Sequence, residues 1–151
     1  MPSPSPWTAP QVLTALAGGA AIIAAFPPWV EARVDVLVFD ATISRDGIDT
    51  HGRLTLFLGF CVLAAVLAGV YGAMSARLAG LAAAVFGAAI LIVGLLAVLD
   101  LENLVDADGT ELDNLPFVDA SAQIGLWLTI AAGAVAALGG LTGAARRAPA
   151  P

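Results

Sequence analysis

The residues best suited to chemistry are four carboxylates that lie close together late in the chain. Asp106, Asp108, Glu111 and Asp113 fall within one short segment. A hard cation such as Ca²⁺ takes about six to eight oxygen ligands, which a carboxylate cluster can supply. The spacing departs from an EF-hand, because Gly109 follows the second aspartate immediately and the third ligand position is missing. These four residues are therefore weak candidates for a metal site, and a solvated acidic loop is the favoured interpretation.

The only histidine, His51, is a second candidate for binding or proton chemistry. It lies near Asp46, Asp49 and Arg53, where it could respond to pH or contact a metal. A transition-metal site needs further nitrogen or sulfur ligands, and the single cysteine, Cys61, lies inside an apolar stretch. We therefore interpret His51 as a solvated residue of a turn.

No arrangement of residues predicts catalysis. Ser44 is separated from His51 by a turn, so that a nucleophile and its base are not placed together. The apolar stretches hold no paired acids, no His-Glu zinc motif and no Ser-His pair. The sequence predicts a protein that is not an enzyme, with no catalytic residue and no cofactor.

The acidic residues are distributed very unevenly along the chain. All twelve fall in two short windows. The first window holds Glu31, Asp35, Asp40, Asp46 and Asp49, and the second holds Asp100, Glu102, Asp106, Asp108, Glu111, Asp113 and Asp119. The windows alternate with long uncharged segments, so the charge pattern also indicates a membrane topology.

Four uncharged, apolar stretches have the character of membrane spans. They cover residues 8–26, 54–74, 78–99 and 120–142, and a span needs about 20 apolar residues. An α-helix satisfies its own backbone hydrogen bonds in lipid. The first stretch ends at Pro27 and Pro28, which disfavour further helix. A cleaved signal peptide is disfavoured there, because residues 1–10 contain no Arg or Lys.

The composition supports a membrane protein of one domain over residues 1–151. Hydrophobic residues make up 60% of the chain and charged residues 12%, with a mean hydropathy of +0.93. The net charge is −6 and no basic cluster exceeds Arg146-Arg147, which argues against nucleic-acid binding. One cysteine excludes an intrachain disulfide. All six basic residues are arginine, which with abundant Ala, Gly and Pro is typical of a GC-rich, prokaryotic genome.

The orientation of the spans rests on loop length and acidic charge. Arginine counting is level at three against three, with Arg77, Arg146 and Arg147 on one side and Arg33, Arg45 and Arg53 on the other. The short link 75–77 and the tails 1–7 and 143–151 contain no acid, whereas the loops 27–53 and 100–119 contain all of them. We predict that the two loops are extracytoplasmic and that both termini are cytoplasmic.

Small residues at a spacing of four predict close helix packing. The second stretch contains Ala65-x-x-x-Gly69 and Ala68-x-x-x-Gly72, and the third contains Gly80-x-x-x-Ala84, Gly87 and Gly94. The fourth contains Ala132-x-x-x-Ala136-x-x-x-Gly140 and Gly133-x-x-x-Ala137. Such residues let helix backbones approach each other in lipid. We favour packing within one antiparallel, up-down four-helix bundle, and a homo-oligomer interface is the alternative.

The first outer loop has the character of a small β-ribbon. Residues 33–43 are β-branched, aromatic and partly alternating, which predicts a strand. Residues 44–47 supply a turn, and residues 48–50 could pair back. A two-stranded ribbon is marginal alone, so it should rest on the helix ends or on the second loop.

The sequence also predicts structural roles for three residues at the ends of the spans. Trp29 fits an anchor at the membrane interface, and Arg53 fits an interfacial charge that extends out of the second helix. Ser121 is a candidate N-cap for the last helix.

Several short motifs resemble a loose group of small four-helix prokaryotic membrane proteins of unknown function. They are Pro28-Trp29, Gly47 ahead of Gly52-Arg-Leu-Thr-Leu-Phe-Leu-Gly59, and Gly125-Leu-Trp-Leu128. The architecture also resembles that of claudin-type tetraspans, which carry strands in their first outer loop. The claudin cysteine pair is absent and the Gly-Leu-Trp lies at the fourth helix. The resemblance therefore implies architecture only, and no functional residues.

The prediction for the whole chain is an all-α, four-span membrane protein with a β-ribbon in its first extracytoplasmic loop. Its function is predicted to be that of a non-catalytic interaction or accessory protein with an acidic outer face. Its partners would be the lipid bilayer and a membrane or extracytoplasmic protein. The alternative is a small transporter or channel-like protein acting as an oligomer. The near-absence of ionisable residues within the spans disfavours that alternative.

Overall fold

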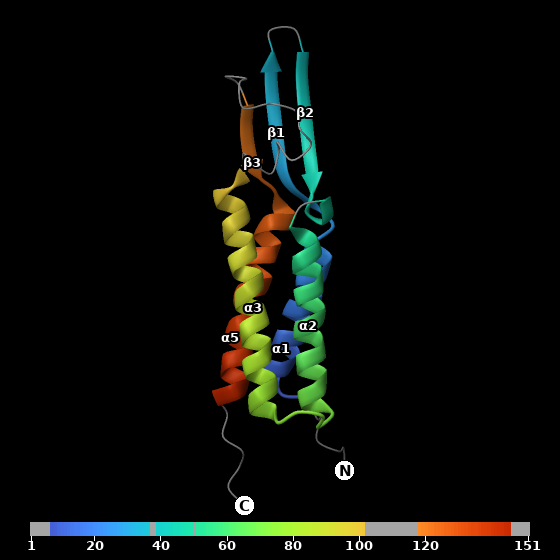
Figure 1. Cartoon of the computed structure of the whole chain (residues 1–151), viewed down its shortest axis with the longest axis vertical. Coiled ribbons are helices and arrows are strands. Elements are labelled where there is room, and N and C mark those ends of the chain that lie inside the picture. Colours follow the sequence, from blue (N-terminus) through green and yellow to red (C-terminus); the bar gives the residue numbers. More distant parts are fainter. Residues whose placement is uncertain (1–6, 37–38, 50, 102–117, 146–151) are drawn as a thin grey trace, which may run out of the picture.

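A computed structural model describes residues 7–36, 39–49, 51–101 and 118–145, and it places a small sheet on one end of a four-helix bundle (Figure 1). The elements in chain order are α1 (Ala9–Ala24), β1 (Pro28–Val36), β2 (Phe39–Asp46), the 3₁₀ turn η1 (Gly47–Asp49), α2 (Gly52–Val70), α3 (Ala76–Leu99), β3 (Val118–Ala122) and α5 (Ile124–Ala145). We call the end of the bundle that carries the strands the sheet end. The opposite end, where residues 71–75 join α2 to α3, is the link end.

Local signals fix the helix boundaries at the link end. Thr8 precedes α1, where its backbone N–H and its hydroxyl both donate to Gln11 Oε1, at 2.8 and 2.9 Å. The link between α2 and α3 turns at Gly72, whose φ of +76° suits a residue without a Cβ. Ser75 then caps α3 by accepting a hydrogen bond from the Leu78 N–H at 3.3 Å. The Ala68-x-x-x-Gly72 motif is therefore not a packing motif, because Gly72 lies in the link.

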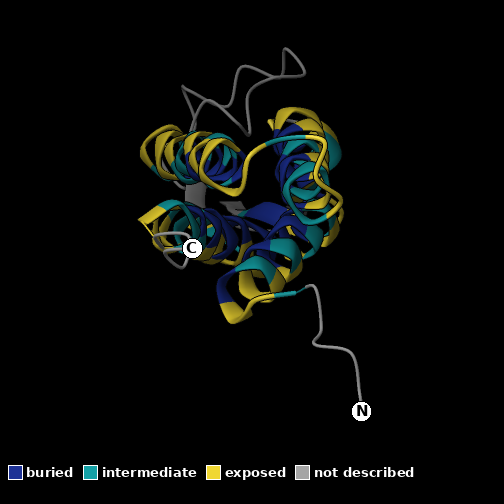
Figure 2. Cartoon of the chain, turned by 90° about the horizontal axis from the view of Figure 1, so that it is seen from below, coloured by how far each residue is buried: buried dark blue, intermediate teal, exposed yellow. Residues whose placement is uncertain are grey.

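The bundle has small residues inside and large apolar residues outside. Its main core is built largely from alanines and glycines with Leu58, Val62, Val66 and Ile90. Large side chains such as Leu16, Phe57 and Val85 are exposed on its outer surface. Figure 2 shows the buried residues facing the bundle axis. A soluble bundle reverses this distribution, whereas lipid solvates Leu and Phe as well as a neighbouring helix does.

The four helices form a ring in which α1 packs on α2, α2 on α3, α3 on α5, and α5 on α1. The α3–α5 contact is backbone to backbone. A Cβ at Gly133 would lie 2.5 Å from Leu91 N, one at Gly140 would lie 2.5 Å from Ala84 N, and one at Gly87 would overlap Ala137 N. The prediction that these glycines pack helices within one chain is confirmed. The close contact of Gly18 with Gly59 between α1 and α2 is a further such crossing.

The sheet has three antiparallel strands in the order β2-β1-β3. The predicted ribbon exists, but its turn was misplaced: β1 and β2 pair from Pro28↔Asp46 to Val36↔Phe39, so the reversal lies between Val36 and Phe39 and not at residues 44–47. The prediction that residues 48–50 pair back is also wrong for Ile48 and Asp49, because Gly47–Asp49 form a 3₁₀ turn, and residue 50 lies outside the described residues. The ribbon does not stand alone: β1 also pairs with β3, from Val30↔Ala122 to Val34↔Val118, and only the first two residues of β3 belong to the predicted second loop.

The predicted fourth span began too early. Residues 120–122 belong to β3, and α5 starts at Ile124 and continues to Ala145. Ser121 is therefore a strand residue and not the N-cap of the helix. In the described part of the chain, α2, α3 and α5 are long and apolar enough to cross a membrane, whereas α1 has 16 residues and is shorter.

Candidate interaction surface and its junction with the bundle

Trp29 lies at the centre of the junction between sheet and bundle. Its side chain is 0% exposed, and it forms a second core with Val30, Ala97 and Leu126. Its indole Nε1 donates to the carbonyl oxygen of Ala24, the last residue of α1, at 2.8 Å. The prediction of an interfacial anchor is wrong, because the indole satisfies its donor inside the protein.

Two glycines provide the space that the indole fills. A Cβ at Gly47 would overlap Trp29 Nε1, and a Cβ at Gly125 would lie 2.8 Å from both Trp29 Cδ1 and the Pro27 oxygen. These glycines come from η1 and from the first turn of α5. We call Trp29, Gly47 and Gly125 the tryptophan junction. It brings together segments that are far apart in the sequence.

Hydrogen bonds tie the same segments together. The Gly47 N–H donates to the Pro27 oxygen at 3.2 Å, and the Gln123 N–H donates to the Trp29 oxygen at 2.8 Å. Gln123 Nε2 donates to Ser121 Oγ at 3.2 Å, and that hydroxyl donates to the Glu31 oxygen at 3.3 Å. Ser121 thus links β3 to β1 in place of capping a helix. The sheet is joined to the bundle by packing and by hydrogen bonds at several points.

The motifs that carried the sequence resemblance meet at this junction. Pro28-Trp29 begins β1, Gly47 begins η1, and Gly125 lies in the first turn of α5. Gly52, the first residue of α2, lies so close to Gly47 that a Cβ would overlap its carbonyl carbon. The sequence pattern identified these residues, but their contact depends on the tertiary fold.

The charges of the described residues are concentrated at the sheet end. Seven acidic residues lie in the strands, in η1 or just after α3: Glu31, Asp35, Asp40, Asp46, Asp49, Asp100 and Asp119. Three arginines accompany them, namely Arg33, Arg45 and Arg53. Asp46 and Asp49 are exposed. This end therefore carries a net negative charge.

The residues predicted for metal or proton chemistry do not assemble into a site in the described structure. Asp106, Asp108, Glu111 and Asp113 lie outside the described residues. Within residues 7–36, 39–49, 51–101 and 118–145, no group of three His, Cys, Asp or Glu residues could hold a metal ion. His51 is exposed just before α2. Arg53 is exposed as expected, and its Nε donates to the Ile48 oxygen at 3.0 Å.

A cavity that no sequence pattern predicted lies at the link end. It has a volume of about 940 Å³ and lies among all four helices. Its wall includes Thr14, Val66, Ala83 and Gly140, and Arg77 lies at its rim. Small side chains on four separate helices leave this space, and that arrangement is visible only after the helices are packed.

No model of a known protein family matches this chain, and no curated protein matches it either.

Proposed function

We propose that this chain is a four-span integral membrane protein that binds a protein partner through its acidic, extracytoplasmic sheet. The observation that carries the proposal is the tryptophan junction. A buried indole held between two glycines fixes the sheet on the helix ends, so the sheet presents a preformed surface. A preformed surface loses little conformational entropy when a partner binds.

The placement in the membrane follows from the surface of the bundle. Large apolar side chains are exposed on all four helices, for example Leu16, Phe57, Val85 and Leu138. In water such a surface would aggregate, whereas a bilayer covers it. The helix α1 would span about 24 Å at 1.5 Å per residue, which a locally thinned bilayer accommodates. An up-down path then leaves both termini on the cytoplasmic side.

The charge of the sheet end indicates the chemistry of the partner. Acidic residues outnumber arginines there, and exposed Asp46 and Asp49 lie at the base of the sheet. A membrane or extracytoplasmic protein with a basic surface would be attracted to this end, and such steering weakens as salt rises. The transporter alternative has less support, because Val62, Ile90 and Ala136 are fully buried within the bundle.

Photo-crosslinking in native membranes tests the proposed partner. A photoreactive residue at Thr42 or Ser44, both exposed on β2, is expected to capture a specific protein. The same residue at Leu138, which is exposed on α5, should capture lipid only. The yield at β2 should fall several-fold with Asp46→Asn and Asp49→Asn, because they remove charge from the sheet end. Recovery of only lipid and copies of this chain from β2 would reject the partner role.

Cysteine labelling tests the proposed orientation. In a Cys61→Ala background, single cysteines at Ser44 and Ala145 place one thiol on β2 and one at the end of α5, and both positions are exposed. A membrane-impermeant thiol reagent applied to intact cells should label position 44. Position 145 should react only after permeabilisation. The opposite pattern would invert the orientation, and labelling of both positions in intact cells would contradict an up-down path.

A further inference from the structure

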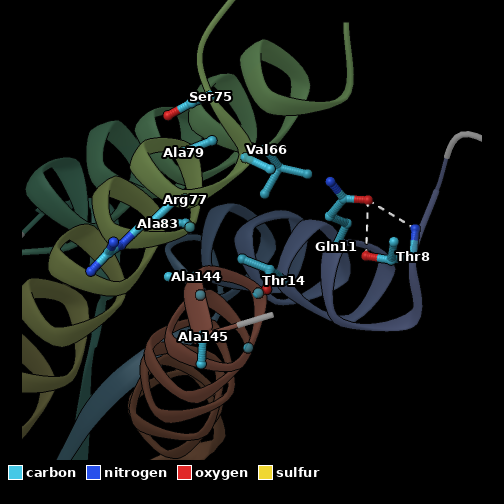
Figure 3. Close-up of a pocket in the computed structure, with 15 residues that line it drawn as sticks. Thr8, Gln11, Thr14, Val66, Ser75, Arg77, Ala79, Ala83, Ala144 and Ala145 are labelled. Carbon is cyan, nitrogen blue, oxygen red and sulfur yellow. Dashed lines mark hydrogen bonds between the residues drawn. The ribbon is translucent and has the colours of Figure 1, made fainter. Parts of the chain in front are cut away.

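The cavity at the link end has the size of a binding site for a small molecule. Its volume of about 940 Å³ falls within the range of roughly 300–1,000 Å³ that is typical of ligand pockets. Figure 3 shows side chains from the four helices around it. It lies at the opposite end from the proposed partner surface, so the two can be tested independently.

The wall of the cavity suits an apolar chain. Val66, Ala79, Ala83 and Gly140 contribute apolar atoms. Thr14 is 2% exposed, and its hydroxyl already donates to the Pro10 oxygen at 2.7 Å, so its hydrogen is not available to a ligand. A hydrocarbon can replace water along such a wall without breaking hydrogen bonds of the protein.

The rim of the cavity is polar, and Arg77 lies beside it with its guanidinium turned away from Gln11 and Val66 (Figure 3). Ser75 and Arg77 line it at the start of α3, and Gln11 lines it in the first turn of α1. The Gln11 amide oxygen accepts two hydrogen bonds from Thr8, and its amide nitrogen lies on the side facing Val66 (Figure 3). Donors therefore lie beside an apolar wall.

The charge at the link end selects the sign of the ligand. Among the described residues, Arg77 is the charged residue at this end, and the first turn of α3 adds the positive end of a helix dipole. The sequence contains no acid between Asp49 and Asp100 or after Asp119, and Arg146 and Arg147 follow α5. An anionic group at the rim would meet no acidic side chain from the packed helices.

We propose that the cavity binds an anionic amphiphile, with an acyl chain along the apolar wall and a carboxylate or phosphate at Arg77. A free fatty acid and an anionic phospholipid share this chemistry, and a surrounding bilayer could supply either. The inference goes beyond the proposed partner role and does not depend on it.

The structure offers a matched pair of variants for the test. Gly143 lines the cavity in α5, and a Cβ placed there meets no atom within 4 Å. Gly143→Leu should therefore fill the cavity without disturbing the helices. Gly19 in α1 is equally open and does not line the cavity, so Gly19→Leu makes the same change elsewhere. Both changes remove a helical glycine, which favours folding.

The experiment measures binding of a fluorescent stearate probe to the full chain in phosphatidylcholine nanodiscs. We expect saturable binding, weakened at least tenfold by Gly143→Leu and unchanged by Gly19→Leu. Arg77→Gln should weaken binding several-fold, whereas Arg77→Lys should largely retain it, because the charge at the rim is kept. Arg53→Gln removes a positive charge at the sheet end instead, and it should leave binding of the probe unchanged.

Competitors identify the source of the ligand. Displacement by oleate identifies a fatty-acid site, and displacement by phosphatidylglycerol alone identifies a phospholipid site. Equal displacement by methyl oleate would overturn the anionic requirement. Binding no greater than to empty nanodiscs, or equal losses in the Gly143→Leu and Gly19→Leu variants, would overturn the site itself. Every one of these results is independent of crosslinking at β2.

Discussion

Replacement of Trp29 by alanine is expected to lower the free energy of unfolding by about 3–5 kcal/mol. The indole is fully buried, and it fills the space between Gly47, Gly125 and the end of α1. Its loss would leave a cavity at the junction and an unpaired carbonyl at Ala24. The sheet should therefore detach from the bundle more easily than the helices separate from one another.

Denaturant titration in detergent measures the loss, and proteolysis of the sheet measures the detachment. Trp127→Ala is the matched control, because this tryptophan is 54% exposed on α5 and its loss should change stability by no more than about 0.5 kcal/mol. Trp29→Phe keeps an aromatic ring and removes the N–H donor. Its loss of stability should therefore fall between those of Trp29→Ala and Trp127→Ala. Equal effects of Trp29→Ala and Trp127→Ala would show that the junction does not hold the sheet.

The second large effect is expected at the contact between α3 and α5. Gly87→Ala should destabilise the bundle by about 1–3 kcal/mol, because the added methyl would overlap the Ala137 backbone and force the helices apart. Gly133→Ala should behave alike, since its Cβ would lie 2.5 Å from Leu91 N. The double variant should lose less than the two single losses combined, because one separation of the helices accommodates both methyl groups.

Thermal unfolding in detergent, followed by size-exclusion chromatography, measures these losses of stability. Gly19→Ala is the control, because a Cβ at Gly19 meets no atom within 4 Å. Its better helix propensity should make it neutral or stabilising by up to about 1 kcal/mol. If Gly87→Ala also stabilised the protein, this result would contradict the close backbone contact between α3 and α5.

The sequence by itself determined the apolar segments and the separation of charge along the chain. Both are local properties of composition. The small residues around Gly80, Gly87, Gly133 and Gly140 also predicted helix packing correctly, because residues four or seven positions apart lie on one helix face. The boundaries of the elements were predicted less accurately. Ala120-Ser-Ala122 continues an apolar run, so the sequence pattern predicts the beginning of a helix there.

Only the tertiary structure decided that these residues form a strand. β3 forms because β1 offers it a pairing edge, from Val30↔Ala122 to Val34↔Val118, and strand formation depends on such neighbours more than on intrinsic propensity. The burial of Trp29 has the same origin. Its sequence position beside a span suggests a lipid interface, but Gly47 and Gly125 make room for it inside.

The cavity at the link end is likewise a property of the assembled ring. Thr14, Val66, Ala83 and Gly140 belong to four different helices, and none of them indicates a cavity within its own segment. Periodicity within one helix shows which face is buried, but it does not show whether four buried faces meet or leave a space. The sequence therefore determined which segments are apolar and which ends carry charge. The packing of distant segments decided where the strand, the tryptophan junction and the cavity lie, because each depends on contacts between residues far apart in the chain.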